Sequence, residues 1–352
     1  MGRTTRTIGW VCTLMLLAAQ ASGREAIIVD HADADIAALS EAQLQNAKDK
    51  LHIAYGHTSH GSQVTTGMSG LVGFANGGGK GLSLPANFLA WNNGGTGGAL
   101  DLHDYFVAGD LGNPDRTTWA TRTRDYLNDP ANADVNVVMW SWCGQADTTA
   151  ANIDLYLTLM SQLEADYPHV RFVYMTGHTN GCSTTGNLFL RNQQIRNYCT
   201  ANGKILYDFA DIESWDPDGL YYGDKLVNDA CQYDSDGNGS LDRNWALDWQ
   251  NSHTLGVDWY SCSSAHSQAL NANRKAYAAW SMFVRIAESL LPRLPGDADE
   301  DGDVDLDDFV ILKRNFGIAS GATWGQGDFD GNGSVTLTDF SILKNNFGAA
   351  AP

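Results

Sequence analysis

Short apolar segments alternate with helical patterns through most of this 352-residue chain, and that alternation limits the possible folds more than any other feature. The apolar segments are rich in β-branched or aromatic residues, and each leads into a Gly-rich or polar loop, as buried strands do. The expected strands are 51–55, 135–140, 170–175 and 205–209. The expected helices are 40–48, 151–166, 188–202 and 271–291. This alternation predicts an α/β domain with a mostly parallel sheet and helices on both of its faces.

A second pattern begins near residue 296, where the segment 296–309 recurs at 327–340. Each copy has oxygen-bearing side chains at positions 1, 3, 5, 9 and 12 of a calcium loop, and Gly at position 6 makes the sharp turn. The first copy offers the side chains of Asp297, Asp299, Asp301, Asp305 and Asp308, with the carbonyl of Asp303. The second offers those of Asp328, Asp330, Asn332, Thr336 and Asp339, with the carbonyl of Ser334. We therefore expect two calcium ions in this tail.

Position 12 of both loops is Asp rather than the Glu of a helix-loop-helix calcium site, and a single helical pattern follows each loop. This duplicated arrangement resembles a type I dockerin over 297–347. The resemblance implies a small all-α domain at 296–352 that folds around calcium and docks to a cohesin or to a cell-surface partner. A third calcium-like loop lies earlier in the chain and offers Asp234, Asp236, Asn238 and Asp242. Its twelfth position is Trp245, so either a third calcium ion or an ordinary Asp/Gly-rich turn fits the pattern.

The charge of the chain excludes two classes of function. With 22 Lys+Arg against 41 Asp+Glu, the net charge is -19, and the chain lacks the basic footprint of a nucleic-acid binder or a binder of anionic membranes. The tail from 296 to 352 alone holds eleven acidic and three basic residues, a net -8. Much of the acidity therefore belongs to the calcium loops.

The N-terminus predicts secretion. Arg3 and Arg6 precede an apolar run at 8–19, and Ala19-Gln20-Ala21 follows as a cleavage site, so we expect a signal peptide at 1–21 and a mature chain from near Ser22. The run is too short to span a bilayer, which takes roughly 20 apolar residues.

Five cysteines remain in the mature chain, and disulfides can form outside the cytosol. Spacing does not fix their connectivity. Our best guesses are Cys231 with Cys262 and Cys143 with Cys182, whereas Cys199 sits in a helical pattern and fits a buried apolar role.

Four polar blocks follow the expected strands in an informative order. Ser59 comes in Gly-His-Thr-Ser after the first strand, Gly112 in a later loop, Gln145 after the second strand, and His266 just before the last helix. This layout resembles the SGNH/GDSL hydrolases over 51–291. The resemblance implies a serine esterase in which Ser59 attacks and His266 acts as general base. The oxyanion donors would be the Ser59 N–H, Gly112 and the Gln145 amide.

The sequence departs from the family pattern at two places. Ser263 replaces the Asp that normally orients the His, so Asp258 or a backbone carbonyl must take that role, and Gln145 replaces the usual Asn. Ser62 is a rival nucleophile in the same loop.

Together these features predict a flavodoxin-like three-layer α/β/α sandwich at 25–294 that works as an esterase on acylated carbohydrate. The polysaccharide assignment rests on association alone, because dockerin-like tails commonly accompany glycan-degrading enzymes. Two alternatives remain. One is a noncatalytic carbohydrate-binding or scaffold protein on a hydrolase-like fold. The other is a metal-dependent hydrolase that uses the imidazoles of His57, His60, His178 and His266.

Overall fold

The computed structural model describes residues 25–290 and 294–350, and the chain divides into two compact units between Arg293 and Leu294. The expected signal peptide lies outside the described residues. Within the described part, no helix has the length and apolar character that crossing a membrane would require.

The larger unit is built on a sheet of seven strands in which every neighbouring pair is parallel. Across the sheet the strands are β1 (Ile27–Val29), β7 (Ile205–Tyr207), β6 (Arg171–Met175), β5 (Val137–Trp140), β2 (His52–Gly56), β4 (Leu100–Asp104) and β3 (Trp91–Asn92). If the five central strands are numbered in chain order, they run 2-1-3-4-5 across the sheet, with β2 as the first. Strand order therefore reverses at β2.

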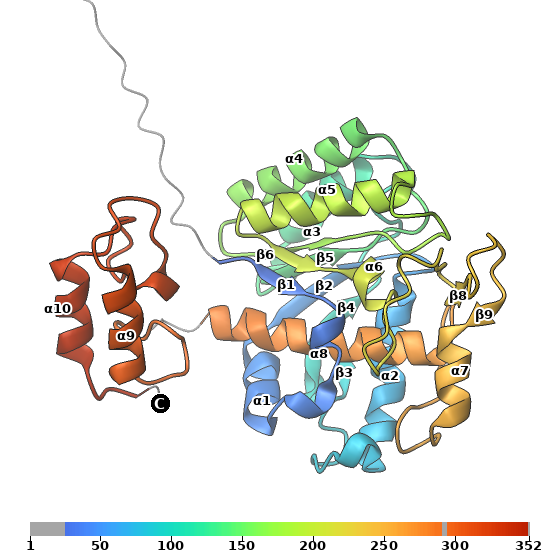
Figure 1. Cartoon of the computed structure of the whole chain (residues 1–352), viewed down its shortest axis with the longest axis horizontal. Coiled ribbons are helices and arrows are strands. Elements are labelled where there is room, and N and C mark those ends of the chain that lie inside the picture. The colour runs from blue at the N-terminus through green and yellow to red at the C-terminus, as the bar shows by residue number, and fades with distance from the viewer. Residues whose placement is uncertain (1–24, 291–293, 351–352) are drawn as a thin grey trace, which may run out of the picture. The chain divides into compact units, whose positions relative to one another are not determined.

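Helices cover both faces of this sheet (Figure 1). One face carries α1 (Glu41–Lys50), α2 (Ser62–Asn76) and α8 (Ala269–Ser289), and the other carries α3 (Thr118–Leu127), α4 (Ala150–Asp166) and α5 (Asn187–Ala201). Shorter elements are α6 (Phe209–Ile212), α7 (Trp245–Ser252) and a hairpin of β8 (Gln232–Tyr233) with β9 (Arg243–Asn244). The predicted α/β class, with a mostly parallel sheet and helices, is confirmed.

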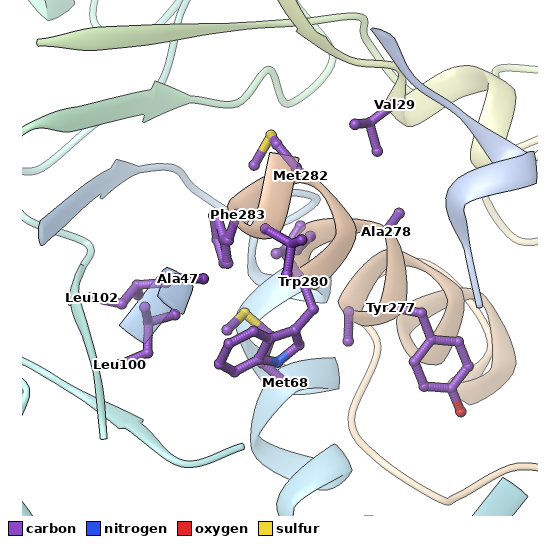
Figure 2. Close-up of a cluster of buried hydrophobic side chains, with 14 of the residues drawn as sticks. Val29, Ala47, Met68, Leu100, Leu102, Tyr277, Ala278, Trp280, Met282 and Phe283 are labelled. Carbon is purple, nitrogen blue, oxygen red and sulfur yellow. The ribbon is translucent and has the colours of Figure 1, made fainter. Parts of the chain in front are cut away.

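The strands bury both faces, which is why their sequences are almost continuously apolar. In β5, Val137 and Met139 pack toward α1, α2 and α8, whereas Val138 and Trp140 pack toward α3, α4 and α5. The residues of α8 that face the sheet include Met282 and Phe283, shown in Figure 2 beside side chains of α1, α2 and β4. Successive side chains of a strand thus point alternately into two separate hydrophobic cores, one on each face of the sheet.

Sequence patterns did not predict α2 or β4. The helix α2 contains several Gly and Thr residues of poor helical propensity, but its Gly67 faces α8 so closely that a Cβ there would lie 2.2 Å from the carbonyl oxygen of Ala272. The strand β4 carries Asp101, which is buried and pairs with His52 at 2.8 Å and with His103 at 3.1 Å. In both cases tertiary contacts outweigh local preference.

The predicted disulfides are wrong, because all five cysteines of the described part are free thiols. Cys231 is buried in the cluster around Trp245, whereas Cys262 packs against the main core. Cys143 contacts His60, and Cys182 packs against the core between the sheet and α3, α4 and α5. The members of each expected pair therefore pack in different places.

The smaller unit is built from two loops, the helices α9 (Leu306–Asn315) and α10 (Leu337–Asn346), and a short 3-10 helix at Trp324–Gln326. A shared apolar cluster includes Val304, Leu312, Val335 and Leu343. The equivalent residues of the two repeats occupy equivalent places in this cluster.

The contact at Gly67 gives a direct test of the packing between α2 and α8. Gly67→Ala is expected to destabilise the larger unit by about 1–3 kcal/mol, because the added methyl group overpacks the helix crossing. Gly73→Ala in the same helix is the control, since a Cβ there meets no atom within 4 Å, and it should stabilise by about 0.5–1 kcal/mol. Denaturant unfolding of both variants measures the difference, and equal effects would contradict the assigned contact.

Candidate functional site

The reversal of strand order at β2 marks the place where a functional site is expected. The helix that follows β2 is α2 and the helix that follows β5 is α4, and they lie on opposite faces of the sheet (Figure 1). Ligands of such sheets bind at the carboxyl ends of the strands at this switch point. The loops at this switch point are 57–61, which follows β2, and 141–149, which follows β5.

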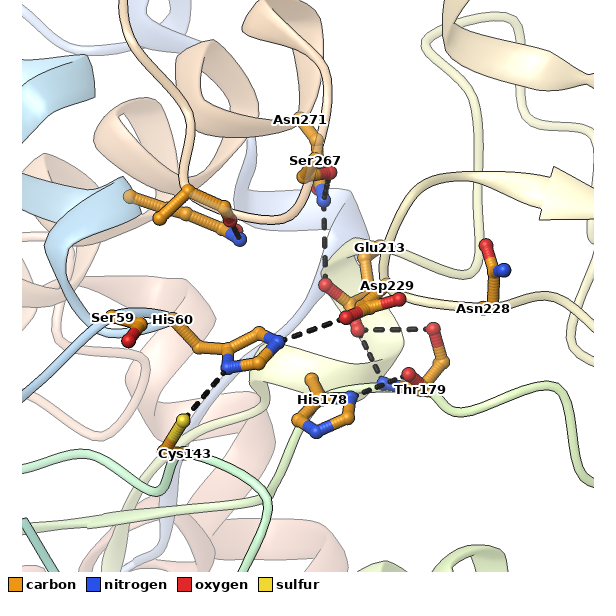
Figure 3. Close-up of polar contacts among 12 residues, drawn as sticks. Ser59, His60, Cys143, His178, Thr179, Glu213, Asn228, Asp229, Ser267 and Asn271 are labelled. Atoms are coloured by element: carbon orange, nitrogen blue, oxygen red, sulfur yellow. Dashed lines mark hydrogen bonds and ion pairs between the residues drawn. The ribbon is translucent and has the colours of Figure 1, made fainter.

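His60, in the first of these loops, connects two other polar side chains (Figure 3). Its Nδ1 lies 3.2 Å from Cys143 Sγ, and its Nε2 lies 3.0 Å from Asp229 Oδ2. If Nε2 carries the proton and donates it to the carboxylate, Nδ1 is left to accept the thiol hydrogen. Sequence patterns did not single out Cys143 or Asp229 as site residues.

The protonation states of this pair follow from burial and charge. Burial lowers the pKa of His60, although the hydrogen bond with Asp229 opposes the shift. Burial alone would raise the pKa of Asp229. The hydrogen bond with His60 and the nearby imidazoles outweigh it and leave that pKa below its ordinary value. A neutral imidazole beside an ionised carboxylate is the resulting state near neutral pH.

His60 is also the middle ring of a stack. The His178 ring lies 4.1 Å away at an angle of 4°, and the His266 ring lies 4.3 Å away at 18°. His57 is not part of the stack, since its Nε2 pairs with Asp104 at 2.7 Å. The structure thus gathers three of the four histidines that the sequence suggested.

The stack bears on the metal alternative. His60, His178 and Asp229 can each offer one ligand atom, and these atoms lie within 4.8 Å of one another. An imidazole binds a metal ion in its own ring plane, however, and the two rings lie in nearly parallel planes. One ring would have to turn before both could hold one ion, so the arrangement is not a preformed metal centre.

A buried ion pair lies behind the stack. Lys275 of α8 and Glu213 are both fully buried, and Lys275 Nζ lies 2.6 Å from Glu213 Oε2 and 2.5 Å from Gln63 Oε1. Glu213 also accepts hydrogen bonds from the backbone and hydroxyl of Thr179, the neighbour of His178. The pair therefore ties α8 to the two segments that carry His60 and His178.

The two serines that the sequence proposed as nucleophiles lie beside His60. Ser59 is exposed in the loop before α2, and its hydroxyl makes no hydrogen bond to any described residue. Ser62 instead donates its hydroxyl to the Ser59 carbonyl at 2.6 Å. His266 is exposed, has φ +64°, and contacts His60 by stacking rather than Ser59 by a hydrogen bond.

The remaining predicted residues lie around a carboxylate that sequence reasoning missed. The buried Asp110 accepts hydrogen bonds from the Gly112 N–H at 2.9 Å, the Thr58 hydroxyl at 2.6 Å and the Gln145 amide at 3.5 Å. The loops that carry Ser59, Gly112 and Gln145 therefore lie side by side, but the Gly112 N–H and the Gln145 amide both donate to Asp110.

The expected replacement for the orienting carboxylate is not found at Asp258. Its carboxylate accepts the Thr254 N–H at 2.8 Å and so closes its own turn. Among the described carboxylates, Asp229 is the one that orients an imidazole of the stack, and that imidazole is His60.

The two loops of the smaller unit have matching geometry. In the first, Asp297 accepts the Gly302 N–H at 3.1 Å, and in the second, Asp328 accepts the Gly333 N–H at 2.7 Å. At position 12, Asp308 and Asp339 are buried and accept backbone N–H groups from the start of the loop and from the helix cap.

The carboxylates of these loops suit a cation. Ligand atoms of Asp297, Asp299 and Asp308 lie within 4.8 Å of one another. Burial, with repulsion from nearby carboxylates, raises the pKa of both Asp297 and Asp328. A bound cation would relieve this repulsion.

The third calcium-like loop adopts the same turn. Asp234 accepts the Gly239 N–H at 2.7 Å, as position 1 does in both tail loops, but Asp242 bonds to Ser235. Trp245, at position 12, is buried and begins α7. A third calcium ion here stays a prediction.

The buried ion pair generates a test of its energetic role. Lys275→Met should destabilise the larger unit by about 3–5 kcal/mol, because it leaves the Glu213 carboxylate buried without a cation. The double variant Lys275→Met/Glu213→Gln should recover much of this loss, since the amide oxygen can still accept from Thr179. Equal stability of the single and double variants, measured by denaturant unfolding, would argue against an uncompensated charge.

Comparison with known proteins identifies the smaller unit. Residues 295–348 match the family model of the dockerin type I domain. Neither a curated protein nor a solved structure gives a significant match to the chain. The matching loops, their helices and this family model together show that residues 295–348 form a dockerin type I domain.

Proposed function

We propose that this protein is a secreted carboxylic-ester hydrolase that removes acyl groups from polysaccharide and is held in place by its dockerin. The dockerin is a calcium-dependent docking module, dockerin domains bind cohesins, and proteins that carry them are typically extracellular or on the cell surface. The reaction and the substrate of the larger unit are the proposal.

The sheet supports the fold that this proposal needs. The order 2-1-3-4-5 is that of flavodoxin-like doubly wound sheets, and the site lies where their ligands bind. We therefore infer a flavodoxin-like three-layer sandwich for residues 25–294.

One observation carries the proposed chemistry: a nucleophilic side chain, an imidazole and a carboxylate are joined in a line at Cys143, His60 and Asp229. Acyl transfer requires such a base, within hydrogen-bond reach of a nucleophile and oriented by a third group. Lys275, whose charge acts on His60, is neutralised by Glu213, which makes phosphoryl transfer a poorer fit.

A neighbouring cavity supports a carbohydrate substrate. It has a volume of about 220 Å³ and is lined in part by His178, Asn180, Asn192, Gln193 and Tyr221. Amide and phenol groups of this kind donate to and accept from sugar hydroxyls. The alternative of a noncatalytic carbohydrate-binding protein would use the same cavity.

The resemblance to SGNH/GDSL hydrolases implies Ser59 as nucleophile and His266 as base, and this remains a prediction. The ester-hydrolase proposal does not depend on these two assignments. Ester hydrolysis requires a nucleophile and an oriented base, and the same loops also supply Cys143 and His60.

Hydrolysis and its pH profile test the proposal. The full chain should release acid from acetylated xylan and from p-nitrophenyl acetate, and kcat/KM should stay high at pH 6.5, the ordinary pKa of His, because the lowered pKa of His60 keeps the base neutral. As pH falls through the pKa of His60, the rate should decline. Glycan binding without acid release from any ester would favour the noncatalytic alternative.

Calcium removal tests the docking module. A chelator should unfold the dockerin, seen as a loss of helical circular dichroism, because the loop carboxylates would then repel one another without compensation. Asp308→Ala and Asp339→Ala should each weaken calcium binding, with Asp307→Ala, an exposed neighbour, as the control. A spectrum insensitive to calcium would overturn the two-ion prediction. Binding of three ions by the full chain, reduced to two by Asp234→Ala, would assign the third loop.

A further inference from the structure

We infer that Cys143 is the nucleophile of this site, with His60 as its general base and Asp229 as the carboxylate that positions His60. This inference rests on the proposed ester hydrolysis for its overall reaction. Its claim about the thiol can be tested without a substrate.

The geometry favours the thiol over the two hydroxyls. Nδ1 of His60 faces Cys143 Sγ at 3.2 Å, whereas the Ser59 hydroxyl makes no hydrogen bond to a described imidazole and that of Ser62 is already donated to a carbonyl. A nucleophile must lie within hydrogen-bond reach of its base. In the described structure Cys143 meets this condition and the serines do not.

Cys143 also differs from the other four thiols of the described part. Cys199 and Cys231 are fully buried, and burial raises the pKa of each. Cys262 lies beside the Asn273 amide, and Cys182 packs against the core near α5. Cys143 is half-buried at the carboxyl end of β5 and has an imidazole partner, which is the setting of a reactive rather than a structural cysteine.

The surroundings hold His60 in the required orientation. Asp229 fixes which ring nitrogen carries the proton, and the rings of His178 and His266 hold the imidazole between them. The Lys275–Glu213 pair, through its bonds to Gln63 and Thr179, anchors the segments on both sides. Asp229, His178 and His266 are positioning residues in this scheme.

The reaction has two stages, acylation of the Cys143 thiol and hydrolysis of the resulting thioester. The thiol proton moves to His60 Nδ1 as sulfur bonds to the ester carbonyl carbon. The tetrahedral adduct then collapses, and the alcohol leaves with the proton from Nδ1. Water next gives a proton to Nδ1 and attacks the thioester carbon. The carbon–sulfur bond then breaks, the carboxylic acid is released, and the sulfur takes back the proton from His60 Nδ1.

Alkylation tests the reactivity of the thiol directly. The full chain is treated with iodoacetamide near pH 7, and modified peptides are quantified over time by mass spectrometry. Cys143 should react at least about tenfold faster than Cys182, which is also half-buried but lacks an imidazole partner. The excess should disappear in His60→Gln and shrink in Asp229→Asn, with near-ultraviolet circular dichroism showing that each variant is folded. A Cys143 rate equal to that of Cys182 overturns the inference.

Ester hydrolysis then separates this inference from the proposed function. Cys143→Ala should lose at least about a thousandfold in kcat, whereas Ser59→Ala should lose far less than Cys143→Ala. Asp229→Asn should lower kcat more than it raises KM and should alter the acid limb of the pH profile. Activity that survives Cys143→Ala but not Ser59→Ala overturns the thiol assignment and leaves the esterase standing. A wild-type chain that hydrolyses no ester removes the proposed function, while the alkylation rates still decide on the thiol.

Discussion

The buried ion pair of Lys275 and Glu213 is the interaction on which the site depends. Two charges without access to water are tolerated only when they meet each other and when their remaining hydrogen-bonding capacity is used. Here Gln63 and Thr179 take up that capacity, and each is close in sequence to a histidine of the stack. These hydrogen bonds offset part of the cost of burying the charges, and they fix the positions of α8, the start of α2 and the loop after β6 relative to one another.

Sequence patterns predict the fold class well because β2, β5, β6 and β7 each bury two faces, which makes their apolar runs conspicuous. They do not predict β4 and α2, because Asp101 and Gly67 fit these elements only through contacts with residues distant in the chain, His52 and Ala272. They also mark the right loops for the site, since Ser59, Gln145 and His266 follow or precede predicted elements. They cannot show that His60 rather than His266 forms a hydrogen bond with a carboxylate, because the segment that contains Asp229 carries no recognisable motif.

The dockerin is the opposite case, since a repeated loop with fixed ligand spacing specifies its turns almost residue by residue. The same spacing recurs at Asp234, and there too the turn forms as expected. What spacing does not fix is the twelfth position, where Asp308 and Asp339 close the tail loops and Trp245 packs inward instead. A local pattern therefore determines backbone shape more surely than it determines coordination.

The two halves of the dockerin are interleaved rather than placed in series. Gly296, which opens the first loop, fits against Leu343 of the second helix, and Gly327 fits in the same way against Leu312 of the first helix. Val304 of the first repeat also exchanges backbone hydrogen bonds with Gly348 and Ala349 after the second. Neither repeat closes its own core alone, so one proteolytic cut between them would destabilise both calcium loops together.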